Sequence, residues 1–374
     1  MSTWNRTLLA AACCLPLLAQ PLLAQPLLAQ PRLAQEVALD PNTSVKIDLP
    51  ADSPLTLVAS NLGESRATTR GGAMVLDLHR SITLRNAGFR RVRGVTLLIT
   101  AQESAPGGKG SVARPSIDVP PSQEFTIPVE LRLLRPLQSG SGPLLQSHLV
   151  RVQLDGVLFD DLSFFGPNKL NSQRAMTVWE TEAQRDRAYY RRVLQAKGEK
   201  GLRDEMLAAL NRQSDRQKLE SATNISPSAA EHVAQYAFLT VPHSPVEPMD
   251  ASASGLDVVN RSGRAIRHIE LGWIARDAEG HEVAVLTPPT TPVSLAPGQK
   301  SRVPRTGKPL DVPRLTGFVR QVEFGDGKVW VPTREDLSTS PLLRVLAPSP
   351  EEQRLADVYN KKGIAALMSD LNRY

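Results

Sequence analysis

The sequence ITLRNAGFRRVRGVTLLI at Ile82–Ile99 recurs in outline as LDVVNRSGRAIRHIELGW at Leu256–Trp273. The two stretches align without a gap, and identical residues coincide in pairs: Asn86 with Asn260, Arg90 with Arg264, Arg93 with Arg267 and Leu97 with Leu271. Apolar residues alternate with other residues towards the end of both stretches, which is typical of a strand with one buried face. The recurrence predicts one structural unit that is present twice in the chain.

Further matching blocks follow in the same order. IDVPPSQEFTIP at Ile117–Pro128 corresponds to VSLAPGQKSRVP at Val293–Pro304, and both read as strand, proline turn, strand. Asp155-Gly156 and Asp326-Gly327 each lie between apolar runs, where an Asp-Gly pair favours a hairpin turn. The chain therefore repeats turn positions as well as strand positions, which favours a duplication.

Short strands separated by regular turn signals predict a mainly β fold. We expect strands at about 45–49, 55–60, 74–85, 92–102, 115–119, 124–134, 148–154 and 157–165, and again at about 234–241, 255–260, 265–276, 281–286, 292–295, 299–304, 315–324 and 328–332. A βαβ rhythm is absent, which disfavours a parallel α/β enzyme. The pattern indicates two tandem antiparallel β-sandwiches.

Each predicted sandwich is followed by helical sequence. Good helix formers dominate from Glu180 to Leu210, and Gly198 and Gly201 should divide this stretch into two helices. Lys200-Gly201 corresponds to Lys362-Gly363 in the C-terminal stretch. The predicted organisation is a signal peptide at 1–35, a first sandwich at 40–170, a helical connector at 171–212, a linker at 213–230, a second sandwich at 231–345 and a C-terminal helical segment at 346–374.

The second half resembles the immunoglobulin-like and fibronectin-III-like modules of bacterial extracytoplasmic proteins. The resemblance rests on VVNRSG at 258–263, RDAEG at 276–280 and SLAPG at 294–298, in that order. The first half carries these motifs less completely, because Phe89 replaces Gly263 and Ser122 replaces Gly298. The resemblance implies immunoglobulin-like β-sandwiches, and a fold of this kind does not fix a function.

The N-terminus has the features of an export signal. Arg6 precedes the mostly apolar stretch Leu8–Ala19, which is too short to span a membrane. The pentapeptide PLLAQ then occurs three times and is followed by PRLAQ at 31–35. We expect a cleaved leader and a periplasmic or extracellular protein without a transmembrane span. A lipid anchor on Cys13, which follows three alanines, is the alternative.

Charge and cysteine content exclude several function classes. The chain has 44 Lys and Arg against 38 Asp and Glu, and the two signs are interleaved, so nucleic-acid binding is disfavoured. Both cysteines, Cys13 and Cys14, lie in the predicted leader. The body of the chain can therefore have no internal disulfide, no thiolate nucleophile and no cysteine-ligated zinc.

Motifs for catalysis, cofactors or metals are not found. No two histidines have a helical metal-ligand spacing, and the GxSxG pattern is incomplete at Gly63–Ala67. Ser139–Gly142 is interpreted as a loop, and Asp155, Asp160 and Asp161 as turn or surface acids. We predict no catalytic residue, no cofactor and no metal ligand.

Aromatic residues are the remaining candidates for binding. Trp273 has the parity of a core residue, and Trp330 also suits the core of the last strand. Trp179, Tyr189 and Tyr190 lie on or before the helical connector. Either these three pack the connector onto its sandwich, or, together with Trp330, they form a partner surface.

These observations favour an exported, non-enzymatic structural or binding protein. Its tandem sandwiches would contact envelope or extracellular proteins or glycans. Two alternatives stay open: a carbohydrate-binding accessory protein, and a glycan or peptide hydrolase whose carboxylates converge only in three dimensions. Self-association through an exposed edge strand is a further possibility.

Overall fold

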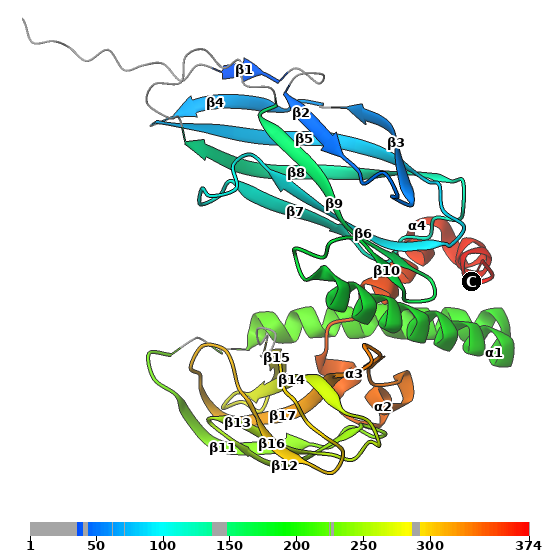
Figure 1. The fold of residues 1–374 in the computed structure, drawn as a ribbon. Coiled ribbons are helices and arrows are strands. Elements are labelled where there is room, and N and C mark those ends of the chain that lie inside the picture. Colours follow the sequence, from blue (N-terminus) through cyan, green and yellow to red (C-terminus); the bar gives the residue numbers. More distant parts are fainter. Residues whose placement is uncertain are drawn as a thin grey trace, which may run out of the picture. The chain divides into compact units, whose positions relative to one another are not determined.

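The computed structural model describes residues 36–39, 44–61, 63–70, 72–136, 148–223, 225, 228–285 and 292–373. The predicted signal peptide, including Cys13, and the predicted loop at Ser139–Gly142 lie outside these residues. The described chain is mainly β, with several sheets and a smaller helical part (Figure 1). This confirms the mainly β class predicted from the sequence.

The N-terminal module is defined as the two sheets formed by strands β1–β10. The strands are β1 (Glu36–Ala38), β2 (Val45–Asp48), β3 (Leu55–Asn61), β4 (Arg66–Arg70), β5 (Ala73–Asn86), β6 (Val92–Thr100), β7 (Lys109–Arg114), β8 (Glu124–Pro136), β9 (Val150–Phe159) and β10 (Phe164–Phe165). One sheet has the order β1-β4-β5-β3, with β8 also paired to β5. The other has the order β10-β9-β6-β7, with β2 also paired to β9.

The C-terminal module is formed in the same way by strands β11–β18. The strands are β11 (His232–Leu239), β12 (Val246–Ser252), β13 (Gly255–Asn260), β14 (Ile266–Arg276), β15 (Glu282–Val285), β16 (Lys300–Pro304), β17 (Asp311–Phe324) and β18 (Val329–Trp330). One sheet has the order β11-β17-β14-β15, with β18 also paired to β17, and the other has the order β12-β13-β16.

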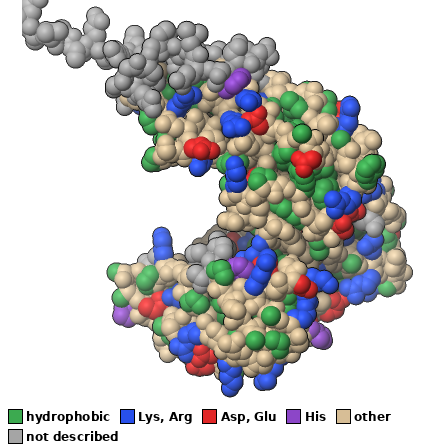
Figure 2. Space-filling view, in the orientation of Figure 1, with side chains coloured by type: hydrophobic (Ala, Val, Ile, Leu, Met, Phe, Trp, Pro, Cys, Tyr) green, Lys and Arg blue, Asp and Glu red, His purple; other side chains and the backbone are tan. Residues whose placement is uncertain are grey.

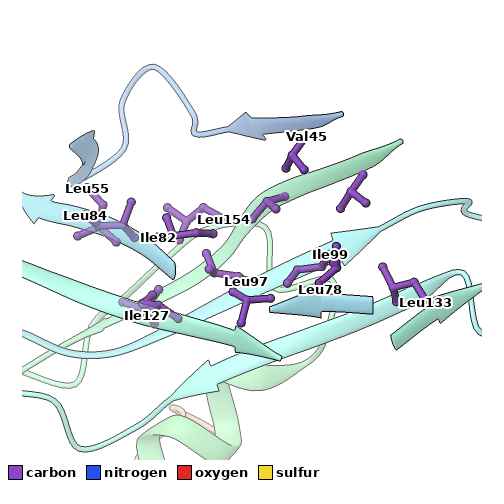
Figure 3. Close-up of a cluster of buried hydrophobic side chains, with 14 of the residues drawn as sticks. Val45, Leu55, Leu78, Ile82, Leu84, Leu97, Ile99, Ile127, Leu133 and Leu154 are labelled. Carbon is purple, nitrogen blue, oxygen red and sulfur yellow. The ribbon is translucent and has the colours of Figure 1, made fainter. Parts of the chain in front are cut away.

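Apolar side chains from both sheets fill the interior of each module. In the N-terminal module Leu78 and Ile82 of β5 belong to the same buried cluster as Leu97 and Ile99 of β6, and Figure 3 shows these side chains close together. In the C-terminal module Trp273 is almost fully buried in the corresponding cluster, as its parity predicts. Alternation along the strands therefore places one face of each sheet in a shared core.

The two modules agree in strand order and in detail. Strands β3-β5-β8 correspond to β12-β13-β16, and β7-β6-β9 correspond to β15-β14-β17. An isolated bridge joins Val92 to Val119 in one module and Ile266 to Leu295 in the other. The aligned sequence blocks thus occupy the same places in both sheet pairs.

The prediction of purely antiparallel sheets is wrong for one strand pair in each module. β2 pairs with β9 in parallel, and β11 pairs with β17 in parallel. In each module an early strand, β2 or β11, thus lies beside a late strand of the same module, β9 or β17, and runs in the same direction. Mixed sheets of this kind are common.

The predicted hairpin at Asp155-Gly156 is also wrong, because both residues lie inside the continuous strand β9. A Cβ on Gly156 would collide with the ring of Phe164, so this glycine serves close packing rather than a turn. By contrast, Gly327 has φ 81° in the turn before β18, as expected of an Asp-Gly turn. The predicted strand at 115–119 is reduced to the isolated bridge at Val119, and the strand β7 just before it was not predicted.

The helices follow the modules as predicted, with different bounds. They are α1 (Ser172–Ala222), α2 (Arg334–Thr339), α3 (Leu342–Val345) and α4 (Pro350–Leu371). Helix α1 continues through most of the predicted linker at 213–230. It is interrupted at Gly198 (φ 63°), and α4 is interrupted at Gly363 (φ 81°). Gly198, rather than Gly201, is therefore the counterpart of Gly363.

The two interrupted helices pack on each other. Tyr190, Leu202 and Met206 of α1 form a buried cluster with Leu355 and Leu367 of α4. Helix α1 also contacts both modules: Thr96 Oγ1 lies 3.2 Å from Met176 Sδ, and Arg185 Nη1 donates to the carbonyl of Pro332 at 3.2 Å. Within the described ranges, the helices are too short or too polar to cross a membrane.

Candidate functional site

A cavity of about 360 Å³ lies where α1 and α2–α4 meet the outer face of β14 and β17. Its apolar wall includes Trp179 of α1, Phe318 of β17, and Leu337 and Val345 of α2 and α3. Ligand pockets in proteins have this order of size and combine an apolar surface with a few polar groups. The cavity is therefore the candidate binding site.

The apolar wall follows from the outer face of the C-terminal sheet. The tip of the Phe318 ring packs against Gly272, where a Cβ would collide with it. Phe318 also joins Ile274, Leu337 and Leu342 in a buried cluster outside the main core. Helices α2 and α3 cover part of this apolar outer face of the sheet. The cavity lies over the part of the face that the two helices do not cover.

The polar wall contains more arginine than acid. The described residues that line the cavity include the six arginines Arg185, Arg212, Arg216, Arg320, Arg334 and Arg344, against the three glutamates Glu182, Glu220 and Glu352. The formal charge of the lining is therefore positive, which favours an anionic ligand.

Two of these arginines are already neutralised by protein carboxylates. Arg334 donates to both oxygens of Glu352, each at 2.8 Å, and Tyr190 Oη donates to Glu352 at 3.1 Å. Arg185 pairs with both oxygens of Asp186 at 2.8 and 2.9 Å. These bidentate pairs fix the shape of the wall and leave little charge for a ligand.

The pKa values around Arg334 follow from this arrangement. Burial opposes ionisation of Glu352, but the hydrogen bonds and charge of Arg334 outweigh it and hold the Glu352 pKa below its ordinary value. Burial, together with the adjacent Glu352 carboxylate, raises the pKa of Tyr190. Glu352 is thus ionised and Tyr190 is a neutral donor near neutral pH.

Three other arginines of the cavity have guanidinium donors that protein carboxylates do not fully satisfy. Arg212 Nη2 lies 3.4 Å from Glu205 and 3.5 Å from Glu352, and Arg320 Nη1 lies 3.4 Å from Glu270. Arg216 pairs with Glu220, but its Nε is buried and lacks a hydrogen-bond partner among the described residues. These guanidinium groups have donors to spare for a carboxylate, phosphate or sulfonate.

Glu182 differs from the other two acids of the cavity, Glu220 and Glu352, which pair with arginines. Burial raises its pKa, although the charges of Arg185 and Arg320 act in the opposite direction. Within the described part of the chain, its carboxyl group makes no hydrogen bond or ion pair to another side chain. An unpaired carboxyl group in a pocket, with a perturbed pKa, is a typical feature of a functional site.

A second, larger pocket, the groove, adjoins the cavity along α1. It has a volume of about 760 Å³ and shares Trp179, Glu182 and Arg320 with the cavity. Arg174 of α1 lies in this groove, 3.3 Å from Glu323 and 3.6 Å from Glu270. The groove thus joins the first turns of α1 to the same sheet face.

The aromatic residues singled out in the sequence have different environments. Trp179 lines both the cavity and the groove. Tyr190 is 0% exposed, so its place in the predicted partner surface has to be corrected: it packs α1 against α4. Tyr189 stacks edge-on against Tyr190 at 5.2 Å, and Trp330 is partly buried against the module core. Of the four, only Trp179 lines the candidate site.

The acids weighed for catalysis or calcium have structural roles. Asp155 accepts hydrogen bonds from the backbone N–H groups of Lys169 (2.7 Å) and Leu170 (3.3 Å) just before α1. Asp161 pairs with Ser163 in a turn, and hydrogen bonds from Ser163 keep its pKa low. The carboxylates of Asp155 and Asp161 therefore stabilise local backbone conformation.

A cluster of potential metal ligands occurs at the turn between β14 and β15. The nearest donor atoms of Asp277, Glu279 and His281 lie within 4.8 Å of one another. Asp277 accepts the His281 backbone N–H at 2.7 Å and lies 3.0 Å from His281 Nδ1. These hydrogen bonds hold Asp277 and His281 together in the turn.

Exposed aromatic rings do not form a row in the described part of the chain. The large exposed aromatic side chains there are Phe89 in the N-terminal module and Phe238 in the C-terminal module. On the face that Figure 2 shows, basic and acidic side chains are interspersed. Neither feature indicates a sugar-stacking platform or a stripe of single charge.

Comparison with known proteins adds no family. No protein-family model matches the chain, and no curated protein matches it. The function proposed below therefore depends on the geometry of the described residues.

Proposed function

We propose that the chain is an exported, non-enzymatic binding protein built from two copies of an immunoglobulin-like β-sandwich. In this proposal the cavity beside the second copy holds a small organic anion with an apolar body. The observation that carries the ligand class is the excess of arginine over acid around a partly apolar cavity. Guanidinium groups bind carboxylates, phosphates and sulfonates through paired N–H donors.

The common strand order of the two modules supports the sandwich and its duplication. Both modules combine a sheet built around β3-β5-β8 or β12-β13-β16 with a second sheet across a shared core. The leader-like sequence before residue 36, with both cysteines, supports export to the periplasm or the extracellular space. Contacts with envelope proteins or glycans would then be made through the remaining module surfaces.

Arg212, Arg216 and Arg320 would bind the anionic group, because each has guanidinium donors that the described carboxylates leave free or hold only at 3.4–3.5 Å. The apolar body would pack against Trp179 and Phe318. Arg334 and Glu352 would stay paired and keep the wall in place. The pocket would thus recognise one charged end and one apolar end of the same molecule.

Isothermal titration calorimetry with naphthalene-2-sulfonate tests this assignment, with the neutral naphthalene-2-sulfonamide as the matched ligand. We expect the residue 36–374 chain to bind the sulfonate and to bind the sulfonamide at least about tenfold more weakly, because charged hydrogen bonds contribute about 1.5–3 kcal/mol. The double variant Arg212→Gln/Arg216→Gln should lose a similar factor for the sulfonate only.

Arg203→Gln is the matched control, because Arg203 lies on the same helix and pairs at the surface with Glu199. It should leave the sulfonate affinity unchanged. Equal affinity for the two naphthalene ligands, or equal loss in the control and the double variant, would show that the cavity does not select anions.

A further inference from the structure

Strand β3 forms an open edge of the N-terminal module. Among the described strands it pairs with β5 alone, and it ends the strand order β1-β4-β5-β3. Every residue from Thr56 to Asn61 is exposed, including Leu57 at 43% and Val58 at 41%. Its sequence, LTLVASN, contains no charged residue and no proline.

Open edges of this kind are normally protected, because their free N–H and C=O groups can pair with another chain. The corresponding strand of the C-terminal module, β12, has the sequence VEPMDAS. Glu247 and Asp250 place charge on that edge, and Pro248 removes a backbone donor. Another edge strand of the same sheet, β8, contains Pro128 and several charged side chains, which protect it in the same way.

An exposed phenylalanine adjoins the same edge. Phe89 is 99% exposed in the turn after β5. This turn lies against the start of β3, because Ala87 N–H donates to the carbonyl of Pro54 at 2.8 Å. Gly263 occupies the corresponding position in the C-terminal module. Both the uncharged edge and the exposed ring therefore belong to one module only.

We propose that β3 pairs antiparallel with β3 of a second copy of this chain, so that two N-terminal sheets join across a two-fold axis. A second copy fits this edge because the strand is uncharged, so pairing it with itself brings no like charges opposite each other. The antiparallel arrangement also brings Phe89 of each copy towards the Asn61 end of the partner's strand. The exposed ring and Leu57 and Val58 would then lose solvent contact in both copies.

The shared bulge in the two edge strands provides a matched pair of variants. Val58 lies at the register shift of β3, and Met249 lies at the register shift of β12. Both side chains are similarly exposed, at 41% and 43%. Val58→Lys places a charge on the proposed interface, and Met249→Lys places the same charge on the corresponding edge of the other module.

Sedimentation velocity of the residue 36–374 chain, from about 1 to about 100 μM, tests the proposal. We expect a concentration-dependent dimer in the unchanged chain and in Met249→Lys, and a monomer in Val58→Lys. Phe89→Gly, which restores the residue of the other module, should weaken dimerisation about tenfold. Thermal unfolding checks that all variants remain folded.

Cysteine cross-linking provides a second readout, because the described chain contains no cysteine. We expect at least one of the single variants Thr56→Cys, Val58→Cys and Ser60→Cys to form a disulfide-linked dimer on mild oxidation. Met249→Cys should form none. A monomer at about 100 μM in the unchanged chain would overturn the proposal. So would a dimer that Val58→Lys leaves intact, since another surface would then hold the copies together.

Discussion

Asn86 and Asn260 make the same hydrogen bonds in the two modules. Asn86 Nδ2 donates to the carbonyls of Arg90 (2.9 Å) and Val119 (3.0 Å). Asn260 Nδ2 donates to the carbonyls of the aligned residues Arg264 (2.8 Å) and Leu295 (3.1 Å). Both asparagines are 0% exposed, so each holds a turn to the strand beside it from inside the protein.

Replacing either asparagine by alanine should destabilise the chain strongly and to a similar degree. Each change removes the side-chain donor of one carbonyl (Arg90 or Arg264) and the acceptor of one backbone N–H (Gly88 or Ser262). One unsatisfied buried group costs about 1–3 kcal/mol. We expect a loss of about 2–4 kcal/mol for Asn86→Ala and for Asn260→Ala in urea unfolding. Asn360→Ala, at an exposed position of α4, is the control and should change stability by less than about 0.5 kcal/mol. A loss in one module only would contradict the common role.

Gly198 and Gly363 should both be sensitive to alanine. Their φ/ψ values of 63°/−164° and 81°/−179° lie in a region that is essentially restricted to glycine. No atom of the described residues lies within 4 Å of a Cβ at either position, so a loss of stability would have a conformational cause. We expect each change to destabilise by about 1–3 kcal/mol in thermal or urea unfolding.

Gly263→Ala is the control for these helix glycines. Gly263 also has an open Cβ position, but its φ is not positive. Alanine should be tolerated there, with a change below about 0.5 kcal/mol. If Gly198→Ala were equally harmless, the interruption of α1 would not depend on the backbone freedom of glycine.

The sequence allowed the repeated parts of the fold to be predicted, because alternation and turn residues are local signals. β5, β6, β13 and β14 all lie close to their predicted bounds. β12 was missed, because Pro248 and Asp250 obscure a strand pattern that the edge position tolerates. At Asp155-Gly156 the sequence predicts a turn where the structure has a strand. The pair suits a turn, but packing of Gly156 against Phe164 decides its conformation.

The candidate site could be predicted only in part. Trp179 was singled out as an aromatic residue of the connector, but Glu182, Arg212 and Arg216 look like ordinary charged positions of a solvated helix. Arg320 lies far away in the sequence, on β17. Their convergence depends on how α1 packs on the sheet, which no spacing in the sequence records. The i,i+4 spacing of Arg212 and Arg216 is the one local signal that they share a helix face.

Glu352→Gln should destabilise the chain strongly at neutral pH. The change leaves the Arg334 guanidinium, which is 3% exposed, without its charged partner, and breaking a buried pair costs about 3–5 kcal/mol. Because the pKa of Glu352 is lowered in the folded state, its contribution is present above the unfolded pKa of about 4.3 and is lost as pH falls through the folded value. The difference between the unchanged chain and Glu352→Gln should therefore shrink on acidification. Glu247→Gln, at an exposed pair with Arg261, should cost less than about 1 kcal/mol, and an equally large effect there would contradict the buried-pair explanation.

Glu182→Gln should have the opposite pH dependence. Burial raises the pKa of Glu182, so the folded state holds its proton more tightly than the unfolded state does. Stability from this group is present below the unfolded pKa of about 4.3 and is lost as pH rises through the higher folded pKa. We therefore expect Glu182→Gln to match the unchanged chain in urea unfolding at about pH 4 and to become relatively more stable as pH rises.

The same residue should control how tightly the cavity binds an anion. As pH rises, ionised Glu182 repels the anion and offsets the charge of Arg320, so naphthalene-2-sulfonate should bind the unchanged chain more weakly. Glu182→Gln should bind it with one affinity across the same range, because glutamine does not titrate. Glu199→Gln, outside the cavity on the same helix, should keep the pH dependence of the unchanged chain. If the affinity of Glu182→Gln varied with pH as much as that of the unchanged chain, a group other than Glu182 would be responsible.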